Sequence, residues 1–282
     1  MTRPCLVSLM VLGSTACARR PHVAAPPLTL GTLVDKLIHT GDQNLHFRIA
    51  SGRLPAIVLE SGGGADASEW AGLLPQLAET TRSAVVSYDR AGFGGSDLPS
   101  RPYDVRRELA ALHAALQQLS LADSVIIVGH SYGGLLAQIY AHEYSKTVQG
   151  LVLVDPNTVD FVDAVGGASS PLLAVPFDTT RPLSRIEMAG KRQVDAFPQT
   201  VDVARRSSPS TNLPIVVITA GDPFWPTDAA NRAWRAAHEA LARGTRRWLV
   251  IATGAGHQIP AARPDLIIAA VAKLLPVARS AR

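Results

Sequence analysis

Cysteine is almost absent from this chain of 282 residues. The two cysteines, Cys5 and Cys17, both stand near the start, and none follows them. Two segments, at His142 and His238, begin like the zinc-binding helix HExxH, but each lacks the second histidine. Because the body of the chain offers neither thiolates nor a zinc helix, we expect no metal and no metal-dependent reaction.

Blocks of charge are missing too. The formal net charge is +4, from 27 basic and 23 acidic residues that are spread along the chain. No P-loop sequence GxxxxGK[ST] occurs, and the GxGxxG spacing fails in residues 92–97, which end in aspartate. Repeats and a late transmembrane run are also absent. We therefore expect no nucleic-acid partner, no nucleotide cofactor and no transmembrane span.

The start of the chain has the layout of a secretory leader. Arg3 precedes a short apolar run over residues 6–12, and small residues follow at 13–17. The apolar run is too short to anchor the chain across a bilayer. Alanines at positions 16 and 18 form a small-x-small pattern, which predicts cleavage after Ala18.

A lipid anchor at Cys17 is an alternative fate for this leader. Against it, Ser14 stands where lipoprotein signals usually carry an aliphatic residue. We expect residues 1–18 to be a leader, residues 19–31 to be a linker, and the protein to be exported. If the opening is only a disordered extension, the protein is cytoplasmic instead.

From residue 32 to 282 the pattern is that of one α/β domain. Short apolar segments predict eight strands, at 34–38, 45–50, 56–59, 84–88, 124–128, 150–154, 215–219 and 247–251. Helical patterns lie between most of them, at 68–80, 105–119, 132–144, 228–243 and 264–275. This alternation predicts a mostly parallel sheet with helices on both faces. Residues 157–212 break the alternation, and we interpret them as a small lid insertion over the carboxyl edge of the sheet.

The strongest local signal is a GxSxG sequence at residues 129–133. A buried strand runs directly into it and a helical pattern follows, which is the context that a nucleophilic serine requires. Ser131 is the predicted nucleophile. The start of the following helix directs backbone N–H groups toward that serine, so the N–H of Tyr132 is a candidate oxyanion donor.

A serine hydroxyl needs a base within hydrogen-bonding reach. His257 lies in a glycine-rich loop between the last strand and the last helix, and it is the predicted base. His130, beside the serine, points away from its hydroxyl at a sharp turn and is expected to be a packing or hydrogen-bonding residue. His238 falls within a helical pattern and is expected to be a surface or boundary residue.

The base in turn needs a carboxylate that fixes its tautomer. Asp222 follows the strand at 215–219 and is our preferred acid. Asp155 follows the preceding strand, keeps the same chain order and is the alternative, although it can also be a structural turn before proline. A glycine-rich loop after an early strand supplies the second candidate oxyanion donor, the N–H of Gly63.

These segments together resemble the α/β-hydrolase superfamily from about residue 45 to 275. The resemblance rests on LESGGG, SYDRAGFGGSD, VGHSYGGLLAQIYAHEY, GLVLVDP, ITAGD and GAGHQIP, which occur in the family's order and spacing. It implies the eight-stranded α/β-hydrolase fold, a triad of Ser131, Asp222 and His257, and an oxyanion hole from Gly63 and Tyr132. Many members carry His-Gly in the first loop where this chain has Ser-Gly, and some place the acid at the position of Asp155.

The expected function is hydrolysis of a small carboxylic ester through an acyl-enzyme, with no cofactor. The same triad also serves enzymes that cleave amides, lactones or C–C bonds, and a non-catalytic binding protein on this fold is a further alternative. Epoxide hydrolases and haloalkane dehalogenases in their usual form need aspartate where Ser131 stands. Trp225 and apolar residues of the lid either line the acyl pocket or pack the lid on the core. Those of the lid are Phe161, Leu172, Leu173, Phe177, Met188 and Phe197.

Overall fold

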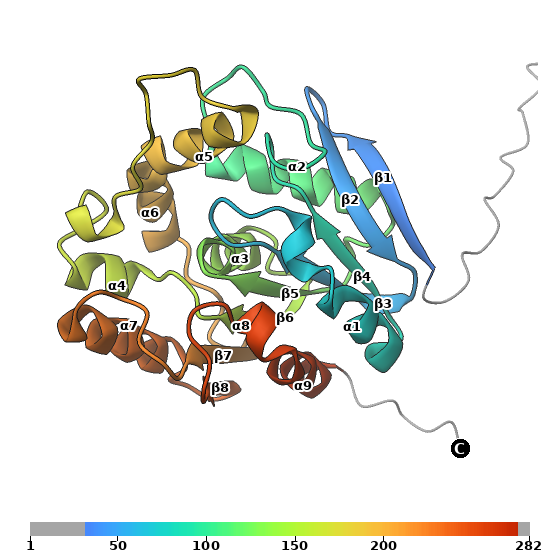
Figure 1. The fold of residues 1–282 in the computed structure, drawn as a ribbon. Helices are drawn as coiled ribbons and strands as arrows, with labels where there is room; N and C mark the ends of the chain where they lie inside the picture. Colours follow the sequence, from blue (N-terminus) through green and yellow to red (C-terminus); the bar gives the residue numbers. More distant parts are fainter. Residues whose placement is uncertain (1–31, 276–282) are drawn as a thin grey trace, which may run out of the picture.

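One eight-stranded sheet forms the centre of the computed structural model, which describes residues 32–275 (Figure 1). The strand order is β1-β2-β4-β3-β5-β6-β7-β8. β2 pairs antiparallel with both β1 and β4, and every other neighbouring pair is parallel. The predicted class, α/β with a mostly parallel eight-stranded sheet, is confirmed.

The elements follow one another in the order expected of such a sheet. The strands are β1 Leu33–His39, β2 Asn44–Ala50, β3 Arg53–Glu60, β4 Ser83–Tyr88, β5 Val125–His130, β6 Val148–Val154, β7 Ile215–Ala220 and β8 Arg247–Ala252. The α-helices are α1 Leu73–Thr81, α2 Val105–Gln118, α3 Tyr132–Glu143, α4 Val159–Ala164, α5 Arg185–Asp195, α6 Phe197–Arg205, α7 Asp228–Leu241, α8 Ile259–Ala262 and α9 Pro264–Leu274. Two short 3-10 helices are η1 Ala67–Trp70 and η2 Pro171–Leu173.

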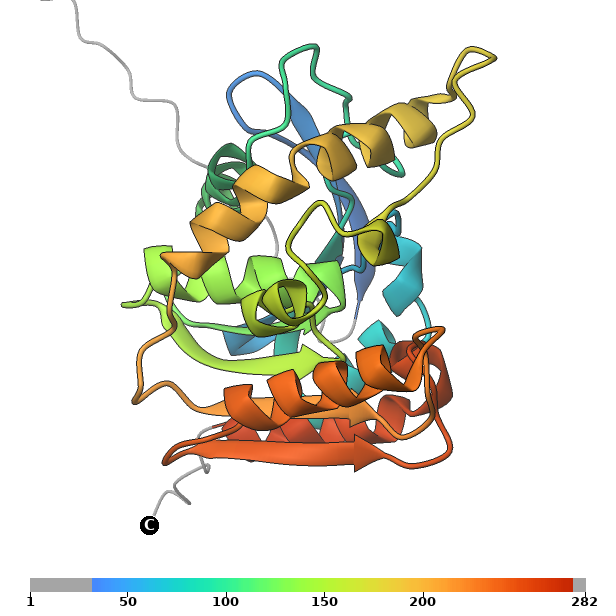
Figure 2. The ribbon, with the colours of Figure 1, turned by 90° about the vertical axis from the view of Figure 1, so that its left-hand side faces the viewer.

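Helices cover both faces of the sheet (Figure 2). On one face α1 and α9 pack against alternate side chains of the central strands, and on the other face α2 and α3 do the same. Strands β4 and β5 are buried along their whole length, as their runs of valine and isoleucine without polar alternation predict. Burial on both faces holds the carboxyl ends of these strands rigidly at one edge.

The predicted helix at 68–80 is two elements, η1 and α1. Proline lacks an N–H group and is tolerated only in the first turn of a helix. Pro75 therefore requires a helix that begins close to it, and α1 begins at Leu73 after Gly72. The other predicted helices differ from the observed ones by two residues or fewer at their ends.

Residues 157–212, the expected lid, contain α4, η2, α5 and α6. Two arginines of α5 tie this segment to the loop that follows β4. The guanidinium of Arg185 donates to the carbonyl of Ser96 at 2.5 Å, and Arg192 donates to the carbonyl of Arg101 at 2.5 Å. The segment is thus attached to a loop at the carboxyl end of the sheet.

The predicted leader (1–18), the linker (19–31) and Cys17 lie outside the described residues. Between residues 32 and 275, no helix combines the length and the apolar character that crossing a membrane requires.

Candidate active site

The turn between β5 and α3 carries Ser131. Its φ of 51° and ψ of −118° lie in a region that side-chain-bearing residues rarely adopt. A Cβ on Gly129 would lie 2.5 Å from the carbonyl oxygen of Gly133, and a Cβ on Gly133 would lie 2.3 Å from that of Glu60. Both positions therefore require glycine, and the strained turn presents the serine hydroxyl at the end of the strand.

Ser131 and His257 are brought together, as the sequence predicted. The Oγ atom of Ser131 lies 3.0 Å from Nε2 of His257. The other ring nitrogen, Nδ1, lies 2.7 Å from Oδ2 of Asp155. Because a carboxylate only accepts hydrogen bonds, Nδ1 carries the proton and Nε2 is free to accept from the serine hydroxyl.

The prediction of Asp222 as the acid is wrong. The carboxylate that contacts His257 is that of the alternative, Asp155. Asp155 has no exposed surface, and its second oxygen accepts the N–H of Ala220 at 2.8 Å. Burial acts to raise the pKa of Asp155, but the hydrogen bond from His257, the neighbouring His238 and the Ala220 N–H outweigh it and lower that pKa. The group is therefore a buried carboxylate that faces the base.

Asp222 is directed elsewhere because the chain turns early after β7. The N–H of Gly221 donates to carbonyls of Ala252 and Ala255, and a Cβ on Gly221 would lie 2.6 Å from the Ala252 carbonyl oxygen. The backbone of Asp222 is then tied to Ala255, and its side chain is exposed beside a surface pocket along α7. It forms no hydrogen bond with His257.

The two expected oxyanion donors lie beside each other. Tyr132 is the first residue of α3, so its N–H has no acceptor within the helix. A Cβ built on Gly63 would lie 3.5 Å from Cβ of Tyr132, which places the two backbones in close proximity. The N–H of Gly62 is occupied by the carboxylate of Glu69 at 2.8 Å, and that of Gly63 donates to no acceptor among residues 32–275.

Comparison with known families agrees with this architecture. A family model described as "alpha/beta hydrolase fold" matches residues 55–206, more than half of the chain. The matched stretch contains the serine turn and Asp155 and ends before His257.

The chain belongs to the α/β-hydrolase fold family.

Several proteins are similar to parts of this α/β-hydrolase chain. An uncharacterized protein of Mycobacterium tuberculosis is 37% identical over 113 residues, which are 40% of this chain and 32% of the relative. A proline iminopeptidase of Lactobacillus delbrueckii subsp. lactis is 31% identical over 129 residues, 43% of each chain. The chain thus spans about a third of the length of the first of these relatives.

A solved structure matches nearly the whole domain. Epoxide hydrolase A from Mycobacterium thermoresistibile has a TM-score of 0.62 with 19% identity, over 86% of this chain and 98% of that one. At this identity the likeness shows the α/β-hydrolase fold alone.

An aromatic cluster lies next to His257, the predicted base of this α/β-hydrolase. The ring of Phe224 stacks on that of His257, with centroids 4.2 Å apart and an angle of 20° between the planes. Trp225 and Phe161, both candidates for the acyl pocket, have ring centroids 4.8 Å apart, and Trp234 packs edge-on against Phe161. Phe161 is fully buried and forms the inner side of the cluster, whereas Phe224 is 47% exposed and forms its outer side.

His238 is fully buried, so the prediction of a surface or boundary position is wrong. Its Nδ1 lies 2.8 Å from the Thr219 hydroxyl, and its Nε2 lies 2.9 Å from the carbonyl oxygen of Pro156. It approaches Oδ1 of Asp155 to 3.7 Å. Burial lowers the pKa of His238, so the ring is neutral near pH 7. The sequence feature that could have predicted its burial is its position one helical turn after Trp234, on the core-facing side of α7.

His130 connects the base loop to the first glycine loop. Its Nδ1 lies 2.6 Å from Oε1 of Glu69, and its Nε2 lies 2.9 Å from the carbonyl oxygen of His257. This agrees with the expected hydrogen-bonding role of His130. Glu69, which also binds Gly62, was not foreseen, because no local pattern joins it to the serine turn. Within residues 32–275, no cluster of three or more potential metal ligands occurs.

Proposed function

We propose that this protein is a serine hydrolase that cleaves a small carboxylic ester through an acyl-enzyme. The observation that carries the proposal is the continuous chain of contacts from the Ser131 hydroxyl through His257 to the buried carboxylate of Asp155, at 3.0 and 2.7 Å. A nucleophile, a base and a group that orients the base are the parts that acyl transfer requires.

In the first step the Oγ atom of Ser131 attacks the ester carbonyl carbon while Nε2 of His257 takes the hydroxyl proton. Asp155 stabilises the imidazolium that forms, because its carboxylate already accepts the Nδ1 proton. The tetrahedral intermediate then collapses. The C–O bond to the leaving alcohol breaks, and His257 returns the proton to that alcohol.

In the second step a water molecule replaces the alcohol. His257 takes a proton from the water as its oxygen attacks the acyl carbon. A second tetrahedral intermediate collapses, the bond to Ser131 breaks, and the serine oxygen recovers its proton from the imidazolium. The carboxylic acid leaves and the enzyme is regenerated without any cofactor.

Both tetrahedral intermediates carry a negative oxygen. The unoccupied N–H groups of Gly63 and Tyr132 are the proposed donors to it, and the amino end of α3 adds a favourable dipole. This environment selects for reactions in which a carbonyl oxygen becomes an anion, which is what ester hydrolysis requires.

The test is hydrolysis of short- and medium-chain p-nitrophenyl esters, together with labelling by a fluorophosphonate probe. We expect Ser131→Ala to abolish labelling and to lower kcat by about 10⁴-fold or more. The exposed Ser100→Ala variant is the matched control and should retain both signals. A folded wild type that neither hydrolyses these esters nor reacts with the probe contradicts the enzyme proposal and favours a binding role.

A second candidate is cleavage of an amide bond by the same residues. The similarity to a proline iminopeptidase over 129 residues is what favours it. Aminoacyl p-nitroanilides with and without an N-terminal proline distinguish the two, because their leaving group is an amine. Faster turnover of an anilide than of the matched ester would favour the peptidase over the esterase. Labelling by the fluorophosphonate without turnover of either substrate would instead point to a lactone or C–C substrate.

A further inference from the structure

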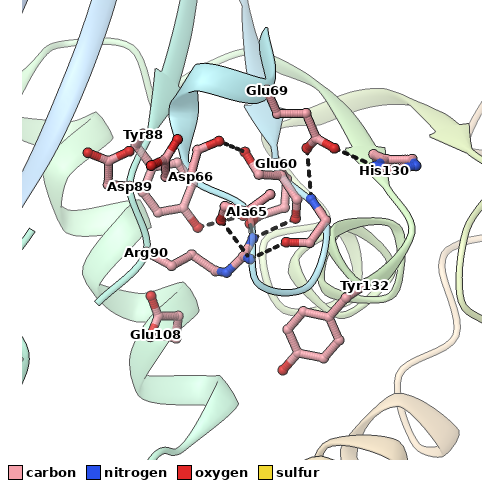
Figure 3. A network of polar contacts seen from close by, with 12 residues as sticks. Glu60, Ala65, Asp66, Glu69, Tyr88, Asp89, Arg90, Glu108, His130 and Tyr132 are labelled. Atoms are coloured by element: carbon pink, nitrogen blue, oxygen red, sulfur yellow. Dashed lines mark hydrogen bonds and ion pairs between the residues drawn. The ribbon is translucent and has the colours of Figure 1, made fainter. Parts of the chain in front are cut away.

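A buried arginine lies beneath the glycine loop that carries the proposed oxyanion donor. Arg90, labelled in Figure 3, follows the end of β4. It is 1% exposed. Its guanidinium donates to the carbonyl oxygen of Ser61 at 2.5 Å, to that of Gly62, and to that of Ala65 at 3.4 Å. Three carbonyls of one five-residue loop are therefore held by a single side chain.

A buried carboxylate holds the guanidinium itself in place. Glu60, the last residue of β3, accepts from Arg90 at 2.7 Å and from the hydroxyl of Tyr88 at 2.5 Å. Burial alone would lower the pKa of Arg90, but the charge of Glu60 outweighs that effect and raises it. The arginine is thus permanently charged and fixed to two adjacent strands of the sheet.

The carbonyl of Gly62 determines where the next N–H points. In a trans peptide the C=O and N–H bonds are coplanar and point in opposite directions. Because the carbonyl of Gly62 is turned toward Arg90, the N–H of Gly63 is turned away from it. On the other side of Gly62, its own N–H is fixed by Glu69 at 2.8 Å.

Glycine gives this loop no orientation of its own. Residues 62–64 are all glycine, and a peptide between two glycines rotates at little cost because neither has a Cβ. An external contact must therefore select the orientation in which Gly63 donates. Arg90 also lies 5.7 Å from the centroid of the Tyr132 ring, so it contacts the peptide that leads into Gly63 and faces the side chain of the other proposed donor residue.

We propose that Arg90 is a positioning residue for the oxyanion hole. It holds the Gly62–Gly63 peptide with the Gly63 N–H directed toward the oxygen that becomes negative during acyl transfer. The proposal rests on the proposed function of Ser131. Its chemical basis is the planar guanidinium, which donates in several directions at once, whereas a lysine ammonium is a single point charge.

The experiment compares an ester with its thionoester, in which sulfur replaces the carbonyl oxygen. Sulfur is the weaker acceptor, so a formed oxyanion hole favours the oxygen ester. Arg90→Lys keeps the charge opposite Glu60 but cannot reach the same carbonyls. We expect it to lower kcat for the oxygen ester by about 10²-fold, the usual effect of losing one oxyanion donor. KM should change little, and the oxo-to-thiono ratio of kcat/KM should fall by a similar factor.

Two further variants keep this test decisive. Glu108→Gln changes another buried carboxyl near Arg90 that accepts from Ala91 and does not contact the loop, so its ratio should equal that of the wild type. If Arg90→Lys fails to fold, Glu60→Gln/Arg90→Met carries the test, since it removes both partners of the buried ion pair together. Circular dichroism and thermal unfolding establish that each variant is folded.

The outcomes separate this inference from the proposed function. A folded Arg90 variant that retains the wild-type oxo-to-thiono ratio overturns the positioning role, even if its stability or total activity is lower. A wild type that is inert toward esters and toward the fluorophosphonate overturns the proposed function instead. A collapsed ratio in the Arg90 variants, with an unchanged ratio in Glu108→Gln, supports the inference.

Discussion

The ends of β6 and β7 carry the same dipeptide and use it differently. Asp155-Pro156 follows β6, and Asp222-Pro223 follows the next strand of the sheet. Asp155 has a positive φ of 42°, is fully buried and faces His257, whereas Asp222 is exposed at the surface. The same Asp-Pro dipeptide thus provides one buried carboxylate that contacts His257 and one carboxylate that is exposed to solvent.

Neighbouring contacts explain the difference. β6 lies directly beside β5, the strand that ends at the serine turn, and the N–H of Asp155 donates to the carbonyl of Ile218 on β7 at 2.6 Å. Asp155 therefore lies between two strands, and its carboxylate is enclosed. β7 is followed by Gly221, which packs against the loop after β8 and turns the chain outward. The surroundings of a turn, more than its sequence, decide the role of its aspartate.

The largest expected effect separates the two aspartates directly. Asp155→Asn should lower kcat for the best p-nitrophenyl ester by about 10³–10⁴-fold, because the amide no longer fixes the productive tautomer of His257. Asp222→Asn should change kcat by about twofold at most, as is usual for an exposed side chain.

Steady-state kinetics on both variants check this prediction. Thermal unfolding shows whether Asp155→Asn is folded at the assay temperature. A large loss in Asp222→Asn with near-normal activity in Asp155→Asn would reverse the assignment and restore the acid that we first preferred.

The two aspartates also show which parts of the site can be predicted from the sequence. Ser131 and His257 are recognisable because each has a local signature, a strand before GxSxG and a glycine loop before the last helix. The choice between the two aspartates needs the strand order and the close packing of Gly221, which no local pattern contains. The fold class follows from the repeated alternation of apolar strands and helices, which depends on burial on both faces of the sheet.

Residues that act through distant partners were the hardest to foresee. Arg90 forms a hydrogen bond with Gly62, and His130 forms hydrogen bonds with Glu69 and with the carbonyl oxygen of His257. Each pair is far apart in the sequence. Their partners become visible only when the strands are placed side by side. His238 was misjudged because a histidine within a helical pattern is ordinarily exposed.

A second prediction compares the side chains that donate hydrogen bonds to backbone carbonyls at the ends of β6 and β7. His238→Ala should lower the free energy of unfolding by about 2–4 kcal/mol, because it opens a cavity and leaves the carbonyl of Pro156 without its donor. Arg235→Ala removes a half-buried donor to the carbonyl of Ala220, the last residue of β7, and should cost about 1 kcal/mol or less. Urea unfolding at pH 7 measures both. Equal losses would mean that the two strand ends are supported equally.

The third prediction concerns the pH dependence of stability. Burial lowers the pKa of His238 from its ordinary value of 6.5, so below pH 6.5 the unfolded chain binds a proton that the folded chain does not. The contribution of His238 to stability therefore falls as the pH drops below 6.5, with a slope from this group of up to about 1.4 kcal/mol per pH unit.

His238→Gln removes this proton and should flatten the profile between pH 6.5 and the lower pKa of the folded state. Burial also lowers the pKa of His113, which both proteins share, so the difference between wild type and variant isolates His238. Urea unfolding at several pH values measures the slope. Parallel profiles for the two proteins would show that His238 does not titrate differently in the folded and unfolded states.

The smallest expected effect lies on the exposed side of the site, in the loop that carries Asp222. The rings of Phe224 and His257 stack with centroids 4.2 Å apart, so the face of Phe224 would lie over the imidazolium of the proposed acyl transfer. An exposed cation–π contact contributes about 0.5–1 kcal/mol, which corresponds to about a two- to fivefold loss of kcat/KM in Phe224→Leu. Phe224→Tyr retains an aromatic face and should behave as the wild type does. If leucine and tyrosine give the same rate, Phe224 acts only by covering the ring, and the loop of Asp222 contributes shape to the site but no electrostatic stabilisation.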